Sequence, residues 1–221
     1  MTRPIVIAID GPAGAGKSSV SSGVARRLGI ARLDTGSMYR AVTWAALRDG
    51  TNLDDETALA SLARRLDLSF DVSGILIDGR PRETEIRDPA VTASVSKVSR
   101  HPAVRAALVS RQQKLAEQGP AVVEGRDIGT VVVPWAPVKI FLTASARERA
   151  RRRAKDLEAA GHEVDLDRLQ AEIEARDAAD DKTTPLVPAG DAVAIDSTAK
   201  TIDEVVDEIA ALAAAAGLGV R

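Results

Sequence analysis

A glycine-rich segment close to the start of the chain constrains its fold more than any other feature. Residues 11–18 read Gly-Pro-Ala-Gly-Ala-Gly-Lys-Ser and match the pattern G-x-x-x-x-G-K-[ST] at every fixed position. A continuous apolar run over residues 4–9 precedes the segment, and an amphipathic stretch over 18–28 follows it. A buried strand, a glycine loop and a helix in this order predict a parallel α/β sheet. They also predict a loop that surrounds the phosphates of a nucleoside triphosphate.

The residue types of this loop suit a phosphate group. Glycines let the backbone approach an anion closely, and the following helix presents its positive N-terminus. We expect Lys17 to reach the β- and γ-phosphates of ATP and the Ser18 hydroxyl to bind Mg²⁺. The alternative, a glycine-rich turn that binds nothing, is disfavoured by the strand before it and the helix after it. The predicted ATP-binding residues are Gly11, Pro12, Ala13, Gly14, Ala15, Gly16, Lys17, Ser18 and Ser19.

Composition excludes several other classes of protein. The chain has 221 residues and no cysteine, so disulfides and thiolate metal sites are ruled out. Its formal net charge of −2 argues against a protein that mainly holds a nucleic-acid polymer. No apolar run approaches membrane-spanning length, and the first residues show no signal-peptide pattern. We therefore expect a cytoplasmic monomer that has small-molecule substrates and neither membrane nor nucleic-acid partners.

The remaining pattern alternates short apolar runs with amphipathic stretches. Strands are expected over residues 4–9, 31–34, 119–124, 138–143 and 192–196. Helices are expected over residues 18–28, 38–48, 56–66, 89–98, 102–117, 146–160 and 166–177, and from residue 202 onward. This alternation predicts a five-stranded parallel sheet covered by helices, with ligands beyond the carboxyl ends of its strands. Residues 68–72 and 75–77, around a Ser73-Gly74 turn, predict a β-hairpin that interrupts this pattern as a small insertion.

The phosphate loop alone leaves the reaction open, and three classes compete. A regulatory GTPase needs a base-reading segment such as Asn-Lys-x-Asp, but the one asparagine, Asn52, lies in no such context. A motor-type ATPase needs an acidic residue after an apolar strand, and Glu124 could serve. A small-molecule kinase needs arginines that bring two anionic substrates together. Arg40 and Arg126 follow predicted strands, and Arg176 precedes a predicted loop. A helical cluster holds Arg147, Arg149, Arg151, Arg152 and Arg153. A solvated, salt-bridged helix face is the alternative for that cluster, because Glu148 and Asp156 are interspersed.

Five segments, in order along the chain, resemble the bacterial cytidylate kinases, a branch of the nucleoside-monophosphate kinases. They are residues 9–18 (IDGPAGAGKS), 33–40 (LDTGSMYR), 96–105 (SKVSRHPAVR), 124–130 (EGRDIGT) and 137–145 (PVKIFLTAS). The second and fourth segments are far more specific than the phosphate loop. The resemblance implies one kinase domain in three parts. These are a core (about 1–66, 89–145 and 185–221), a β-containing monophosphate-binding insertion (about 67–88) and a helical lid (about 146–180).

The resemblance also implies a role for each matching residue. Arg40 and Arg126 would hold the phosphate of CMP, in a pocket that Thr35 and Tyr39 line. The residues that would read cytosine are Ser96, Arg105 and Asp127. Arg176 and Asp180 would face the ribose. The lid arginines that would close over the transferring phosphate are Arg149, Arg152 and Arg153.

One segment departs from the family pattern. The stretch after Asp180 is shorter by about two residues, and an arginine that would contact the CMP phosphate is missing there. Lys182 could replace it, although a point charge does not reproduce a bidentate guanidinium.

The expected activity is transfer of a phosphate from ATP to CMP, and also to dCMP, with Mg²⁺. A carboxylate such as Asp127 accepts from the N4 amino group of cytosine, whereas uracil presents a carbonyl at that position. Asp127 could instead pair with Arg126 or another neighbour and only hold its loop. Asp34 and Glu124, each at a strand end, are candidates for positions close to Mg²⁺. The alternatives are a kinase of another monophosphate such as UMP, and a nucleotide-binding ATPase switch without an acceptor.

Overall fold

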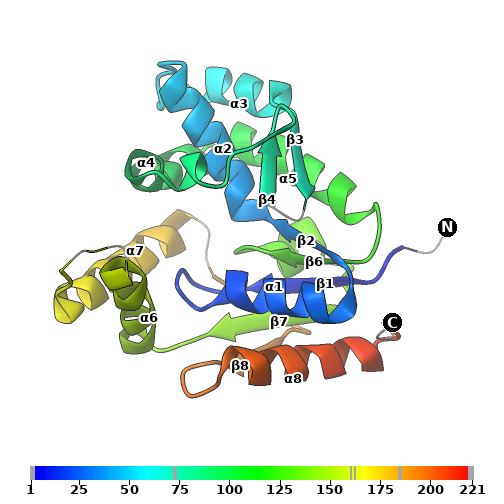
Figure 1. Cartoon of the computed structure of the whole chain (residues 1–221). Coiled ribbons are helices and arrows are strands. Elements are labelled where there is room, and N and C mark those ends of the chain that lie inside the picture. Colours follow the sequence, from blue (N-terminus) through cyan, green and yellow to red (C-terminus); the bar gives the residue numbers. More distant parts are fainter. Residues whose placement is uncertain (1–2, 72–73, 160, 162, 184–185, 219–221) are drawn as a thin grey trace.

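The computed structural model describes residues 3–71, 74–159, 161, 163–183 and 186–218. At its centre is a five-stranded sheet in the order β2-β6-β1-β7-β8 (Figure 1). Every pair of neighbouring strands in it is parallel. The strands are β1 (Val6–Asp10), β2 (Ala31–Asp34), β6 (Ala121–Glu124), β7 (Val138–Thr143) and β8 (Val193–Asp196). The predicted fold class, a five-stranded parallel sheet covered by helices, is confirmed.

Alternate side chains of the central strand β1 enter two different cores, as the twofold repeat of a strand requires. Ile7 and Ile9 pack with helices α1 (Lys17–Leu28) and α8 (Ile202–Ala215) on one face of the sheet. Val6 and Ala8 pack on the other face, beside the end of α5 (Pro102–Ala116). Because both faces are covered, the strands read as continuous apolar runs.

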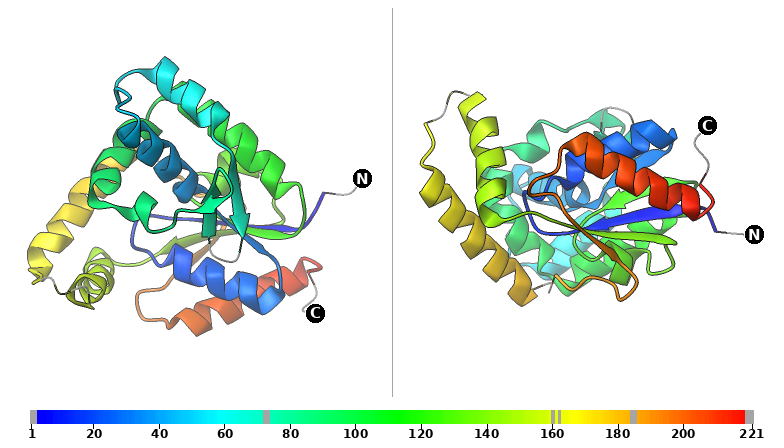
Figure 2. Two further views of the ribbon diagram at one scale, coloured as in Figure 1. Left: turned by 45° about the horizontal axis from the view of Figure 1, so that its top comes forward. Right: turned by 90° about the horizontal axis from the view of Figure 1, so that it is seen from below.

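A third apolar cluster joins four helices to a small antiparallel sheet, β3-β4-β5, which the left view of Figure 2 brings forward. The helices are α2 (Thr35–Arg48), α3 (Glu56–Arg65), α4 (Pro89–Ser99) and α5, and the strands are β3 (Leu68–Asp71), β4 (Gly74–Ile77) and β5 (Arg80–Pro81). Leu68, Ile75 and Ile77 share this core with Met38 and Leu59, so the hairpin packs on the helices around it. The three-part division of the chain stays a prediction.

Two helices, α6 (Ala146–Ala159) and α7 (Leu166–Thr183), pack against each other at one side of the molecule (Figure 2, right). Helix α7 continues through Thr183, although the sequence indicated an end at residue 177 and a loop after Arg176. Asp, Ala, Lys and Thr fill that stretch without Gly or Pro, so the helix has no local stop signal. The side chains of Arg176, Asp180 and Lys182 lie outside the described part of the structure, as do Val72 and Ser73 of the hairpin turn.

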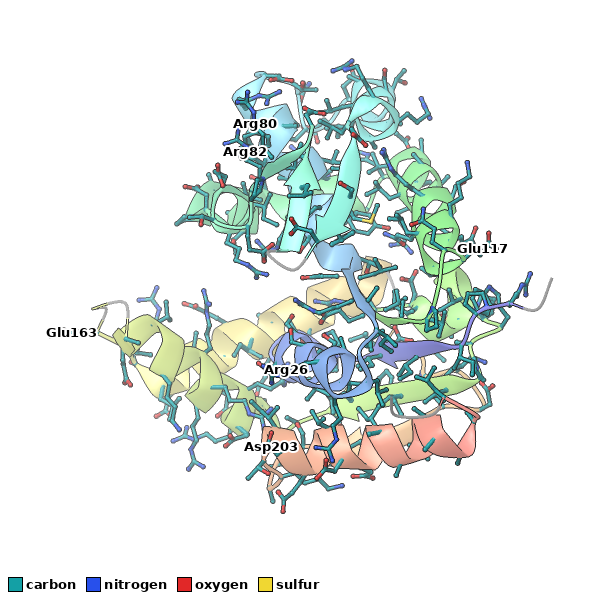
Figure 3. The ribbon with its side chains drawn as sticks, turned by 45° about the vertical axis from the view of Figure 1, so that its right-hand side comes forward. Arg26, Arg80, Arg82, Glu117, Glu163 and Asp203 are labelled. Atoms are coloured by element: carbon teal, nitrogen blue, oxygen red, sulfur yellow. The ribbon has the colours of Figure 1, made fainter. Side chains whose placement is uncertain are left out.

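The other differences are short. The first strand begins at Val6 and includes Asp10, and a third strand, β5, extends the hairpin. Two single turns, the 3₁₀ turn η1 (Glu85–Arg87) and the π-helical turn η2 (Ile128–Val132), were not predicted. In the part of the chain that is described, no helix is both long and apolar enough to cross a bilayer. Charged side chains such as Glu117, Glu163 and Asp203 are exposed on the outer surface (Figure 3).

Candidate active site

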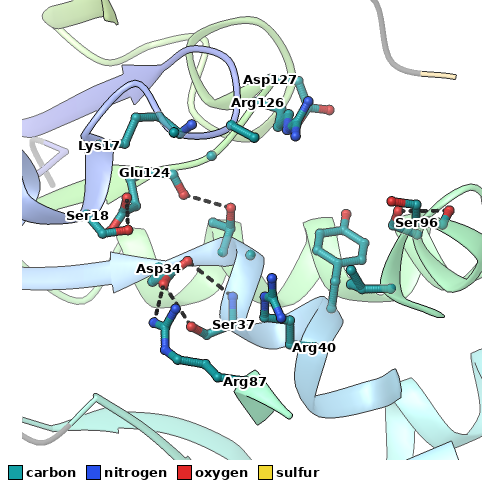
Figure 4. A pocket seen from close by; sticks show the side chains of 18 of the residues that line it. Lys17, Ser18, Asp34, Ser37, Arg40, Arg87, Ser96, Glu124, Arg126 and Asp127 are labelled. Carbon is teal, nitrogen blue, oxygen red and sulfur yellow. Dashed lines mark hydrogen bonds and ion pairs between the residues drawn. The ribbon is translucent and has the colours of Figure 1, made fainter. Parts of the chain in front are cut away.

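A cavity of about 280 Å³ opens at the carboxyl ends of β2 and β6, beside the glycine loop that follows β1 (Figure 4). Eleven of the predicted site residues line it: Ala13, Gly14, Lys17, Ser18, Thr35, Tyr39, Arg40, Ser96, Arg105, Arg126 and Asp127. Its other lining residues are Asp34, Gly36, Ser37, Arg87, Val95, Ser99, Glu124 and Gly125. Segments up to about a hundred residues apart in the sequence therefore meet at the edge of the sheet that the strand pattern indicated.

The glycine loop holds its own lysine. The Lys17 ammonium group donates to the carbonyl oxygens of Gly11 and Pro12, each at 2.7 Å. Burial and, to a smaller extent, the nearby Arg126 guanidinium together lower the pKa of Lys17 to about 8. A polyanionic nucleotide would favour the charged ammonium group and raise this pKa again. The loop therefore holds a cation that an arriving phosphate stabilises.

A buried carboxylate connects the glycine loop to the neighbouring strands. Glu124 accepts from the Ser18 hydroxyl at 3.1 Å through Oε2, and from the Ser21 hydroxyl at 2.8 Å through Oε1. Arg32 forms an ion pair with the same Oε1 atom at 2.6 Å. Burial raises the pKa of Glu124, and the neighbouring Asp34 carboxylate adds to the rise, whereas Arg32 opposes it. Because Arg32 and Ser21 occupy Oε1, the other oxygen is directed toward Ser18.

These oxygen atoms suit Mg²⁺. The cation prefers hard oxygen ligands and usually takes only one or two from the protein, with phosphates and waters supplying the rest. Ser18 Oγ and Glu124 Oε2 lie 3.1 Å apart beside the loop, and Asp34 lines the same cavity. Among the described residues, no group of three or more His, Cys, Asp or Glu side chains could hold a metal by itself. The chemistry of this part of the site therefore fits a cation that arrives with a nucleotide.

On the other side of the cavity, α2 begins directly after β2. Asp34 caps the helix by accepting from the backbone N–H of Ser37 at 3.1 Å. Thr35 donates its hydroxyl to the backbone carbonyl of Glu124 at 2.7 Å and so fixes the first turn of α2 to β6. One helical turn later, Arg40 lines the cavity and donates to the Thr92 hydroxyl at 2.9 Å. Burial raises the pKa of the neighbouring Tyr39 phenol. The start of α2 thus places an arginine and a tyrosine on the cavity wall.

The turn after β6 carries Arg126 and Asp127. Asp10, the last residue of β1, accepts from the backbone N–H groups of Ile128 and Gly129 at 2.6 and 2.8 Å. Burial raises the pKa of the Asp10 carboxyl, although these two hydrogen bonds oppose the rise. Across the cavity, Asp127 forms an ion pair with Arg105 of α5. The predicted cytosine-reading carboxylate therefore has an arginine partner, and this partner is Arg105.

Two of the three predicted lid arginines contact the glycine loop, and none of the three lines the cavity. Arg149, only 6% exposed, donates to the Ala13 carbonyl at 3.0 Å and forms an ion pair with Asp177 of α7 at 2.6 Å. Arg152 donates to the Ala15 carbonyl at 3.2 Å. The side chain of Arg153 is exposed. Two members of the cluster thus support the loop from outside, while Arg176 and Asp180 lie in the part of α7 whose side chains are not described.

Arg87 is the cavity-lining arginine that sequence reasoning missed. It follows the hairpin and ends the turn η1, so the search for residues after parallel strands did not reach it. No local signal separates it from Arg80 and Arg82, which lie nearby in the sequence but do not line the cavity. Its position depends on how the turn packs, which the sequence pattern does not encode.

Comparison with known proteins identifies the family of this chain. Residues 7–215 match the sequence model described as "Cytidylate kinase". A cytidylate kinase of Desulforamulus reducens is 53% identical, covering 95% of this chain and 96% of its own. That of Caldanaerobacter subterraneus is 47% identical, covering 93% and 92%. Among solved structures, a gluconokinase from Sinorhizobium meliloti shares the fold, with a TM-score of 0.50, 20% identity and coverage of 98% and 96%. The chain belongs to the cytidylate kinase family.

Proposed function

We propose that this protein phosphorylates CMP, and also dCMP, with ATP and Mg²⁺. One observation supports the proposal above all others. The phosphate loop with Lys17 and Ser18 lines the same cavity as the arginines Arg40 and Arg126 and the carboxylate Asp127. A site that only hydrolyses ATP has no need for a second anion site joined to a base-reading group. Both substrates can meet in this cavity.

The reaction needs no nucleophile from the protein, because a phosphate oxygen of CMP attacks the γ-phosphorus of ATP and ADP leaves. Lys17 exchanges the carbonyls of Gly11 and Pro12 for phosphate oxygens. Arg40 and Arg126 bind the acceptor phosphate and bring it in line. When Mg²⁺ is bound, it neutralises part of the charge on the donor phosphates, with Ser18 as its protein ligand. Positioning and positive charge carry the catalysis.

At the base end, the Arg105–Asp127 ion pair presents a donor and an acceptor together. Both side chains are mostly buried, with exposed fractions of 25% and 14%. Cytosine suits such a pair, because its N4 amino group donates to the carboxylate while N3 and O2 accept from Arg105 and Ser96. Uracil presents a carbonyl to the carboxylate, and a mismatched buried polar group costs about 1–3 kcal/mol.

Two alternatives are tested by one assay. The protein is incubated with MgATP and with CMP, dCMP, UMP or AMP in turn, and diphosphate and free phosphate are measured. CMP kinase activity predicts fast CDP formation with little free phosphate, whereas a UMP kinase would favour UDP. An ATPase switch would release phosphate with every acceptor. The structure disfavours the switch, because Glu124 already accepts from three side chains and is poorly placed to activate water.

Replacing Asp127 with asparagine is expected to reduce the preference for CMP over UMP by about tenfold. An amide can donate to the O4 carbonyl of uracil, which removes one mismatch worth about 1–3 kcal/mol. The ratio of kcat/KM for CMP to that for UMP measures the effect. Asp54→Asn, which loses an exposed carboxylate paired with Lys97 on α4, is the matched control and should keep the wild-type ratio. If kcat/KM falls equally for both substrates, Asp127 holds Arg105 and its loop but does not read the base.

A further inference from the structure

Provided that the chain phosphorylates CMP as proposed above, we infer that Arg87 is a third binding residue for the acceptor phosphate. It is supplied by the turn η1 that follows the small antiparallel sheet. Arg87 lines the cavity, yet the roles given so far to Arg40, Arg105 and Arg126 leave it without a function. The inference depends on where its backbone is fixed, at which end of the cavity it lies, and what its present partners lose when it moves.

The backbone on both sides of Arg87 is firmly held. Ile86 is fully buried in the apolar cluster under α2, and its carbonyl oxygen accepts from Arg40 at 3.3 Å. Asp88 caps α4 by accepting from the backbone N–H of Ala90 at 2.8 Å. The turn is therefore anchored on both sides, and it contacts α2, which also carries Arg40, as well as α4. Because the backbone is already ordered there, binding a phosphate through the Arg87 side chain would cost little further backbone entropy.

Arg87 lies at the phosphate end of the cavity. Its Nη2 atom is 3.8 Å from Oδ2 of Asp34, which pairs in register with Glu124 on the neighbouring strand. Glu124 in turn accepts from the Ser18 hydroxyl of the phosphate loop. Figure 4 shows Arg87 reaching toward Asp34 on this side, while Ser96 lies at the opposite end. An acceptor phosphate placed for in-line transfer has to lie at the end that holds the loop.

The present contacts of Arg87 can be exchanged for a phosphate. The guanidinium forms an ion pair with Glu83, four residues earlier, and a looser one with Asp34, and its side chain is 48% exposed. Asp34 stays satisfied if Arg87 moves, because it accepts from the Ser37 backbone and hydroxyl and lies 3.6 Å from Arg32. A phosphate dianion offers stronger, bidentate hydrogen bonds to a guanidinium than a loose carboxylate contact does. If Arg87 leaves Asp34 and Glu83 to bind a phosphate, the Asp34 carboxylate therefore keeps its other partners.

A purely structural role is the rival explanation, in which Arg87 only fastens η1 to the end of β2. The two roles differ in what they do to a ligand without a phosphate. A phosphate contact affects CMP but not cytidine, whereas a distorted cavity weakens both. Because CMP and cytidine can be compared without ATP, the experiment measures acceptor binding separately from phosphate transfer.

The test measures dissociation constants for CMP and cytidine, by NMR titration, in the wild type and in Arg87→Ala, Arg87→Lys and Arg82→Ala. In Arg87→Ala we expect CMP to bind about ten- to a hundredfold more weakly and cytidine to bind unchanged. Arg87→Lys should recover part of the loss. Arg82, paired with Glu85 and stacked on Trp44 outside the cavity, is the matched control and should change neither constant.

Unchanged CMP affinity in Arg87→Ala, or equal weakening of CMP and cytidine, would overturn the inference. Thermal unfolding of each variant shows whether a loss of binding comes from a loss of fold. If Arg87→Ala unfolds at the assay temperature, the CMP-to-cytidine comparison in Arg87→Lys decides instead. The proposed function fails separately: a wild-type protein that forms no CDP from CMP and ATP would refute it before any variant is made.

Discussion

Replacing Lys17 with alanine is expected to lower the rate of CDP formation about a hundred- to a thousandfold at saturating MgATP. The Lys17 ammonium group lies 2.7 Å from two loop carbonyls, inside the loop that we propose surrounds the donor phosphates. Its loss removes a charge that acts most strongly in the transition state. The fold should persist, because the substitution removes a half-buried charge and leaves the glycine backbone of the loop intact.

The measurement is kcat with CMP, together with a thermal unfolding curve. Lys200→Ala provides the control, because Lys200 is paired with Glu208 on the surface and lies outside the cavity. We expect the Lys200 variant to keep both kcat and melting temperature. Near-normal turnover of Lys17→Ala would refute the phosphate-binding role of the loop, whereas a collapsed melting temperature would show that the lysine mainly supports the fold.

A single methyl group at Gly11 is expected to cost about 3 kcal/mol of unfolding free energy and to abolish activity. Gly11 has φ +148°, and a Cβ atom there would lie 2.0 Å from the carbonyl oxygen of Leu142 on β7. That oxygen belongs to the backbone of the sheet, so it cannot swing aside as a flexible side chain could. The β1–loop junction has to shift instead, and the phosphate-binding N–H groups shift with it.

Gly119→Ala is the matched control for Gly11→Ala, because nothing lies within 4 Å of a Cβ atom there and no positive φ is required. Urea denaturation of both variants gives the difference in unfolding free energy, and the CDP assay gives the activity. The Gly119 variant should resemble the wild type in both. A Gly11→Ala protein with wild-type stability and turnover would show that the junction tolerates movement and does not set the position of the loop.

Much of the fold could be predicted because its signals are local. The phosphate-loop pattern needs only eight consecutive residues, and the buried strands show themselves as apolar runs between turns. Parallel strands place their carboxyl ends at one edge of a sheet, and this rule predicted that residues following the strands lie together. Four of them, Asp34, Arg40, Glu124 and Arg126, do line the cavity. The resemblance added Ser96 on α4 and Arg105 on α5, which no strand-end rule indicates.

The features that could not be predicted depend on contacts between distant segments. The direct pairing of Arg105 with Asp127 and the support of the loop by Arg149 depend on helix packing that no short pattern encodes. Arg87 reaches the cavity because a buried Ile86 orients a single turn. Helix α7 is longer than expected because its stretch of Asp, Ala, Lys and Thr has no strong breaker, so its end depends on surroundings that the sequence pattern does not show.

The two hydrogen bonds that Asp10 accepts from η2 have a consequence for the timing of catalysis. Asp10 immediately precedes the phosphate loop, and η2 immediately follows Arg126 and Asp127, so one carboxylate joins the donor side of the site to part of its acceptor side. In the folded chain, these two bonds therefore hold the start of the loop close to the turn that carries Arg126 and Asp127. If the small antiparallel sheet or α6 and α7 move, we expect those movements to affect how quickly nucleotides enter and leave. Sequence changes in those outlying parts should then alter nucleotide exchange rates and affinities more than they alter the link between the loop and this turn.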